Sequence, residues 1–132
     1  MRRQLDSRLG IQLEAPFGEY VDDPVGFSRD VLGFNPWEKQ EQIGRALVEK
    51  QRVTAVSCNG AGKTTWGARL LLWFVMTRRD AIVVTTAPTW HQVGLLWREV
   101  RTAFHDAKFS MKGDLMTTRL DMGPTWYAMG LS

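Results

Sequence analysis

Cysteine and long hydrophobic runs are the scarcest features of this sequence. Its 132 residues include a single cysteine, Cys58, so no disulfide can form within the chain, and we expect a reducing compartment, the cytoplasm. The longest uninterrupted apolar run, over residues 70–76, is far shorter than the roughly 20 residues that a membrane-spanning helix needs. Residues 1–6 also lack the apolar stretch of a signal peptide. We therefore expect no membrane partner.

The composition is that of an ordinary globular domain, with 44% hydrophobic and 23% charged residues, which argues against disorder and against fibrous sequence. A chain of this length can bury a core, and two complete domains are not expected. The charge is uneven, because residues 1–52 hold 8 bases and 9 acids whereas residues 53–132 hold 9 and 5. The second part is therefore where a polyanion, such as a nucleotide or a nucleic acid, is expected to bind.

Start and stop signals predict two helices after an arm over residues 1–22. Pro24 suits the first position of a short helix and Gly33 its end. Asn35 is the predicted N-cap of the second helix, with Pro36 at the first position and Glu38 completing a capping box. That helix should run to about residue 50 and bury a face made of Trp37, Ile43, Ala46 and Leu47. Residues 1–35 thus form the predicted arm and short helix, and residues 36–132 the main domain.

Strands and helices are predicted to alternate in the rest of the chain. Residues 52–57 predict a strand, residues 63–77 a helix that is apolar over most of its circumference, and residues 81–86 a strand buried on both faces of a parallel sheet. Residues 89–92 form a second capping box and begin a helix that runs to about residue 105. Its predicted inner face consists of Val93, Leu96, Trp97, Val100 and Phe104. This order predicts an α/β fold with right-handed crossovers.

A phosphate-binding loop (Walker A) is predicted between the first strand and its helix, in the run Ser57, Cys58, Asn59, Gly60, Ala61, Gly62, Lys63, Thr64 and Thr65. The two glycines let successive N–H groups surround a phosphate, and the helix N-terminus adds partial positive charge. Lys63 is the expected catalytic residue, bridging the β- and γ-phosphates of ATP, and Thr64 the expected Mg²⁺ ligand. Ser57 departs from the usual first glycine, and an ordinary glycine-rich surface loop is the alternative.

The loop in this context predicts a P-loop NTPase of the RecA-like class, with a parallel sheet flanked by helices. After it, residues 115–122 and 126–129 are joined by Gly123-Pro124 and predict a β-hairpin. The strand that carries the catalytic carboxylates in such proteins would follow this hairpin, and the sequence does not contain it. We therefore expect the sheet to be incomplete.

Gln40 lies 23 residues before Lys63 and is a candidate for reading the adenine of ATP or ADP, because one amide can donate to N7 and accept from the N6 amino group. Gln42 is the competing candidate, and a glutamine that simply faces solvent is the alternative to both. Trp37 and Phe34 are candidates for covering the adenine ring, although aromatic residues at a helix start also serve as core.

The stretch Ala87-Pro88-Thr89-Trp90-His91-Gln92 resembles the segment after the second strand in the large subunit of tailed-phage terminases, the ATPases that package viral DNA. Residues 23–40, with Asp23-Pro24-Val25-Gly26-Phe27 and Pro36-Trp37, are similar to the stretch before the phosphate loop in that family. The resemblance covers roughly residues 20–105 and implies a bacteriophage protein of the host cytoplasm. The implied partners are double-stranded DNA, a portal protein, a small terminase subunit and sister large subunits.

The resemblance also implies polar contacts to nucleic acid or nucleotide, for which Thr86, Thr89 and Gln92 are candidates, although the last two are equally explained as a capping box. Basic residues after the second strand are either a phosphate-facing surface or a solvated face: Arg98, Arg101, Lys108 and Lys112. The family's arginine in the phosphate loop has no counterpart here, and Arg52, Arg69 and Arg101 remain equivalent guesses for an arginine finger.

No run of four apolar residues ending in Asp-Glu, the Walker B strand, occurs in the sequence, and the family's nuclease carboxylates are also missing. We therefore expect the chain to bind nucleotide but to be a poor ATPase by itself, whereas the parent protein would be a hydrolase. A superfamily-two helicase or translocase, and a non-catalytic nucleotide- or DNA-binding remnant, are the alternatives.

Overall fold

The computed structural model describes residues 15–50 and 62–132, which form a mixed α/β structure. The predicted strand over residues 52–57 lies outside this described part. Along the chain the elements are η1 (Gly18–Tyr20), α2 (Pro24–Phe27), the π-helical turn η2 (Ser28–Leu32), α3 (Glu38–Glu49), α4 (Lys63–Thr77), β1 (Ile82–Thr86), α5 (Trp90–Asp106), β2 (Asp114–Leu115), β3 (Arg119–Gly123) and β4 (Trp126–Leu131). None of the helices in the described part is long and apolar enough to cross a membrane.

The four described strands make one sheet in the order β1-β4-β3-β2. β1 runs parallel to β4, with Val84 opposite Met129, and the other two pairs are antiparallel. The predicted hairpin is confirmed, because β3 and β4 pair across Pro124. The prediction of a parallel sheet holds only for the β1–β4 pair. The strands β3 and β4 are joined by a tight turn, and a tight turn makes the two strands that it joins antiparallel neighbours.

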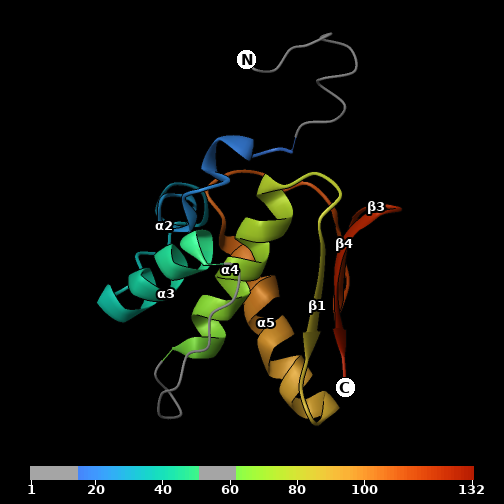
Figure 1. The fold of residues 1–132 in the computed structure, drawn as a ribbon. Coiled ribbons are helices and arrows are strands. Elements are labelled where there is room, and N and C mark those ends of the chain that lie inside the picture. The colour runs from blue at the N-terminus through green and yellow to red at the C-terminus, as the bar shows by residue number, and fades with distance from the viewer. Residues whose placement is uncertain (1–14, 51–61) are drawn as a thin grey trace, which may run out of the picture.

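All the helices lie on one side of this sheet (Figure 1). α4 and α5 pack against each other and against the strands, and α2 and α3 lie beyond α4. The core therefore joins three layers: the sheet, the pair α4 and α5, and the pair α2 and α3. Its largest fully buried side chains are Trp73, Trp97, Phe27, Leu72, Met76 and Leu120. α4 supplies half of these six, and buried residues occur on most sides of this helix, which confirms the prediction that it is apolar around most of its circumference.

The other side of the sheet is open, and this corrects the prediction that β1 is buried on both faces. Val83 and Thr85 face the helices, where the Trp97 Nε1–H donates to Thr85 Oγ1 at 3.0 Å. Ile82 and Val84 face the opposite way and remain 51% and 49% exposed. β1 therefore has the alternating burial of a strand covered on one face only.

The helix signals around residues 24–33 are confirmed. Pro24 occupies the first turn of α2, and the carboxylate of Asp23 accepts a hydrogen bond from the Gly26 N–H at 2.8 Å. Helical backbone continues through η2 and ends at Gly33, whose φ of 70° is a left-handed conformation that favours glycine.

The predicted start of the next helix is wrong by two residues. α3 begins at Glu38, and the N–H of Trp37 is bound by the side-chain oxygen of Gln40 at 3.0 Å rather than by a cap at Asn35. The Asn35 side-chain oxygen, Oδ1, instead accepts from Arg29 Nε at 2.8 Å. Trp37 is also not a core residue, since it is 49% exposed. The fully buried residues of α3 are Gln40 and Gly44, while Ile43, Ala46 and Leu47 are half-buried.

The N-cap of the second predicted capping box is confirmed at the start of α5, where Thr89 Oγ1 accepts from the Gln92 N–H at 3.2 Å. Three of the predicted inner residues of this helix are buried, namely Val93, Trp97 and Val100. Leu96 and Phe104 are half-buried and pack on the edge of the core.

Candidate functional site

The N-terminus of α4 carries the described end of the predicted phosphate loop. Gly62 precedes the helix in a left-handed conformation, with φ 81° and ψ 16°. Lys63 and Thr64 follow in the first turn, and both are exposed, whereas Thr65 is half-buried. The first N–H groups of a helix have no partner within it and carry partial positive charge. This 15-residue helix has no acidic residue in its first turn to oppose an anion. Residues 57–61 of the predicted loop lie outside the described part.

The fold places this helix end beside the carboxyl ends of two strands. β1 and β4 run in the same direction, α4 leads into β1 and α5 follows it, so both helices begin at the edge where the two strands end (Figure 1). Thr86, Thr89 and Gln92, the polar candidates beyond the second strand, are exposed at the same edge. In open α/β sheets ligands bind at this edge.

Gln40 connects α3 to the loop. Its side chain is only 5% exposed, and its Nε2 donates to the carbonyl oxygen of Gly62 at 3.2 Å while its Oε1 holds the Trp37 N–H. A Cβ at position 62 would lie 2.7 Å from this Nε2, so the contact requires glycine there. One amide hydrogen and one lone pair of Gln40 remain for a base, and adenine recognition stays a prediction. Gln42, the competing candidate, is exposed.

The two aromatic candidates for covering adenine lie in different surroundings. The Phe34 ring stacks on Trp66, with centroids 6.2 Å apart, and the Arg69 guanidinium carbon lies 4.5 Å from the Phe34 ring centroid. Trp37 is half exposed, and its Nε1 would come within 3.7 Å of a Cβ at Gly62. Trp37 is therefore the aromatic residue of the pair that remains open to a ligand beside the loop.

An ion pair between the buried Arg69 and the half-buried Glu99 lies behind the site. Arg69 is 9% exposed, and one of its terminal nitrogens lies 3.0 Å from a Glu99 carboxylate oxygen and 3.1 Å from the Thr65 carbonyl oxygen. This pair ties the first turns of α4 to α5, and it was not predicted from sequence. The available signal was a charged residue within the apolar run of residues 66–76, since such a charge is seldom buried without a partner.

The three arginines that are candidates for an arginine finger lie in different surroundings. Arg69 is held by Glu99, Arg101 donates to the Thr117 carbonyl oxygen, and Arg52 lies outside the described residues. Arg98 and Lys112 are exposed, whereas Lys108 lines a surface pocket. The two resolved pKa shifts are remote from the site: burial lowers the pKa of Arg78, and the hydrogen bond to Asp30 raises the pKa of the Tyr20 phenol.

Magnesium was expected at Thr64, and the residue is suited to it, because its hydroxyl is exposed in the first turn of α4 and is an oxygen donor of the kind that Mg²⁺ prefers. Across residues 15–50 and 62–132, no group of three or more His, Cys, Asp or Glu residues could hold a metal ion by itself.

Comparison of the chain with protein-family models, with curated proteins and with solved structures found no match. The functional assignment therefore depends on the residues and their geometry.

Proposed function

We propose that this chain binds ATP or ADP together with Mg²⁺ through residues 57–65, as the nucleotide-binding part of a terminase-type DNA-packaging ATPase. The observation that carries the proposal is the exposed pair Lys63 and Thr64 at the start of α4, directly after the left-handed Gly62. Both lie at the edge where parallel strands end, which is where P-loop proteins bind phosphate.

The role of each residue follows from its position. Backbone N–H groups at the start of α4 donate to phosphate oxygens, and the Lys63 ammonium binds the β- and γ-phosphates. Mg²⁺ held by Thr64 and the nucleotide would neutralise phosphate charge. Gln40 holds the Gly62 carbonyl oxygen and so fixes the end of the loop from α3. Trp37, half exposed beside Gly62, is available to cover the base.

The packaging assignment is more specific and depends on the resemblance of residues 23–40 and 87–92 to terminase large subunits. It carries with it double-stranded DNA, a portal protein and sister subunits as partners of the whole motor. Because the sequence has no Walker B carboxylates, we expect this chain to bind nucleotide with little turnover.

Calorimetric titration of ADP and ATP, with and without Mg²⁺, tests the proposal. Lys63→Ala should weaken binding at least about tenfold, since it removes a charge-assisted hydrogen bond to phosphate. Thr64→Ala should reduce the gain that Mg²⁺ gives. Lys112→Ala is the matched control, because it removes an exposed lysine beyond the far end of α5.

Two results would count against the proposal in different ways. Unchanged affinity in Lys63→Ala contradicts the assignment of the phosphate loop. Robust Mg²⁺-dependent turnover by the isolated chain contradicts the argument from the missing carboxylates.

A further inference from the structure

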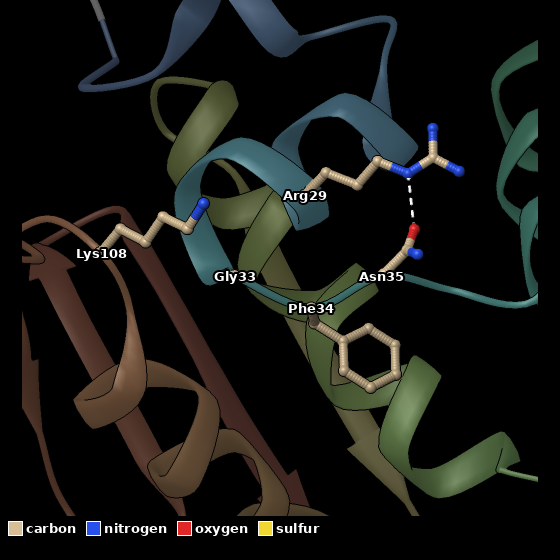
Figure 2. Close-up of a pocket in the computed structure, with 5 residues that line it drawn as sticks. All are labelled: Arg29, Gly33, Phe34, Asn35 and Lys108. Atoms are coloured by element: carbon tan, nitrogen blue, oxygen red, sulfur yellow. Dashed lines mark hydrogen bonds between the residues drawn. The ribbon is translucent and has the colours of Figure 1, made fainter.

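A surface pocket of about 480 Å³ lies where η2 meets the end of α5. Its lining residues are Arg29, Gly33, Phe34, Asn35 and Lys108 (Figure 2). None of them belongs to the predicted phosphate loop. The pocket surrounds the turn after a π-helical segment, a rare geometry that is frequent at functional sites.

Hydrogen bonds fix the shape of this turn. Ser28 Oγ donates to the Phe34 carbonyl oxygen at 2.7 Å, and the Phe34 N–H donates back to the Ser28 carbonyl oxygen at 2.9 Å. The Lys108 N–H donates to the Val31 carbonyl oxygen at 2.8 Å, which anchors the end of α5 to η2. The pocket is therefore built by contacts between segments far apart in sequence.

The aliphatic part of the Lys108 side chain packs against the turn at Gly33. A Cβ at Gly33 would lie 3.4 Å from Lys108 Cε, so the aliphatic chain lies against a glycine whose φ of 70° already disfavours other residues. Figure 2 shows the Lys108 side chain beside the Gly33 end of the segment and the Arg29 side chain nearer its Asn35 end, with the guanidinium directed away from Lys108. One cationic side chain thus lies toward each end of this short stretch of backbone.

The charged and amide side chains that line the pocket, those of Arg29, Asn35 and Lys108, carry hydrogen-bond donors. Arg29 donates to the Asn35 side-chain oxygen and to Glu41, which occupies the acceptor of Asn35 and leaves its NH₂ group and one guanidinium nitrogen open. The Lys108 ammonium has no ion-pair partner in the described part of the chain. Donors of this kind bind ligands rich in acceptor oxygens.

Two further donors lie against the aromatic ring of the pocket. Trp66 Nε1 and Arg69 Nε are the buried side-chain nitrogens without a hydrogen-bond partner among the described residues. Both side chains pack on Phe34, at 6.2 Å between ring centroids for Trp66 and at 4.5 Å from the ring centroid for the Arg69 guanidinium carbon. Both unpaired nitrogens thus belong to side chains that pack on Phe34 without lining the pocket themselves.

We propose that this pocket is a second anion site, which binds a phosphate group through Lys108, Arg29 and the Asn35 amide. The phosphate has two possible sources with the same chemistry, a free polyphosphate or the backbone of duplex DNA. The pocket and the proposed nucleotide loop share no residue, so variants can address the two sites separately.

NMR titrations of the full chain test the proposal, with pyrophosphate and a 20-base-pair duplex as separate probes. The backbone amides of Gly33, Phe34 and Asn35 report on this pocket, and those of Lys63 and Thr64 report on the loop. Saturable shifts of the pocket amides with pyrophosphate assign a free phosphate, and shifts with the duplex alone assign a DNA backbone contact.

Variants separate this site from the first. Lys108→Ala should weaken binding at the pocket about tenfold, the loss of one charge-assisted hydrogen bond, and Lys108→Glu should weaken it further. Lys112→Ala, the matched control, and Lys63→Ala should leave the pocket shifts unchanged. The proposal is overturned if the pocket amides respond to neither probe, or if Lys108→Glu binds as tightly as the native chain with its circular dichroism unchanged.

Discussion

Replacing Gly62 with alanine adds a single Cβ atom at the contact between α3 and the end of the predicted phosphate loop. The residue has a φ of 81°, where a side chain costs about 1–2 kcal/mol. The new Cβ would also lie 2.7 Å from Gln40 Nε2, which must move and thereby loses its hydrogen bond to the Gly62 carbonyl oxygen, worth about 1 kcal/mol. The lower entropy of the unfolded alanine chain returns about 0.4–1 kcal/mol. We therefore expect a net loss of roughly 1–2.5 kcal/mol in the free energy of unfolding.

Part of this loss should depend on Gln40. In the Gln40→Ala background the clash is absent and the hydrogen bond is already lost, so Gly62→Ala should then cost only its backbone strain. The double-mutant cycle should show a coupling of about 1 kcal/mol, as contacting residues do. Because Gly62 ends the loop, Gly62→Ala should also weaken ADP binding.

Urea unfolding followed by tryptophan fluorescence gives these free energies. Gly94→Ala is the control, since a Cβ there has nothing within 4 Å and the residue lies inside α5. It should raise stability by up to about 1 kcal/mol through helix propensity. If Gly62→Ala is as stable as the native chain, or if its cost is the same with and without Gln40, the described contact between α3 and the loop is refuted.

Two further predictions concern the body of the fold. A Cβ at Gly130 would lie 2.6 Å from Val93 and 2.8 Å from Trp97, so Gly130→Ala should cost about 1–3 kcal/mol in urea unfolding, and a neutral result would contradict the packing of α5 on β4. The pKa of Tyr20 is raised in the folded chain, so its contribution to stability is complete below the ordinary pKa of 10.0 and is lost as pH rises through the folded pKa. Tyr20→Phe should therefore flatten the alkaline decline of the free energy of unfolding with pH. An unchanged dependence on pH would contradict the Tyr20–Asp30 hydrogen bond.

Local signals predicted those parts of the fold whose partners are near in sequence. The bounds of α4, the cap at Thr89 and the hairpin turn at Pro124 all follow from residues within a few positions of one another. The predicted start of α3 was wrong because other hydrogen bonds compete there. The Asn35 side-chain oxygen accepts from Arg29, and Gln40, two positions beyond Glu38, is the residue whose side chain reaches back to the helix start.

The sheet and the site show the same limit. An apolar run such as residues 82–84 does not reveal how many of its faces are covered, and β1 is covered on one. Sequence placed Lys63 and Thr64 at a helix start, which the structure confirms, and it nominated Gln40. It did not give the contact of Gln40 with Gly62, the pairing of Arg69 with Glu99, or the pocket beneath Lys108, because each joins segments that only the folded chain brings together.

The central claim is that a nucleotide–metal complex binds at the start of α4. Titration of the ¹⁵N-labelled chain with ADP and Mn²⁺, which replaces Mg²⁺ and broadens nearby signals, locates that complex directly. The account predicts that the amide signals of Lys63 and Thr64 broaden first and that Lys63→Ala abolishes the effect at the same concentrations. Broadening that leaves these two amides sharp while it affects other parts of the chain would contradict it.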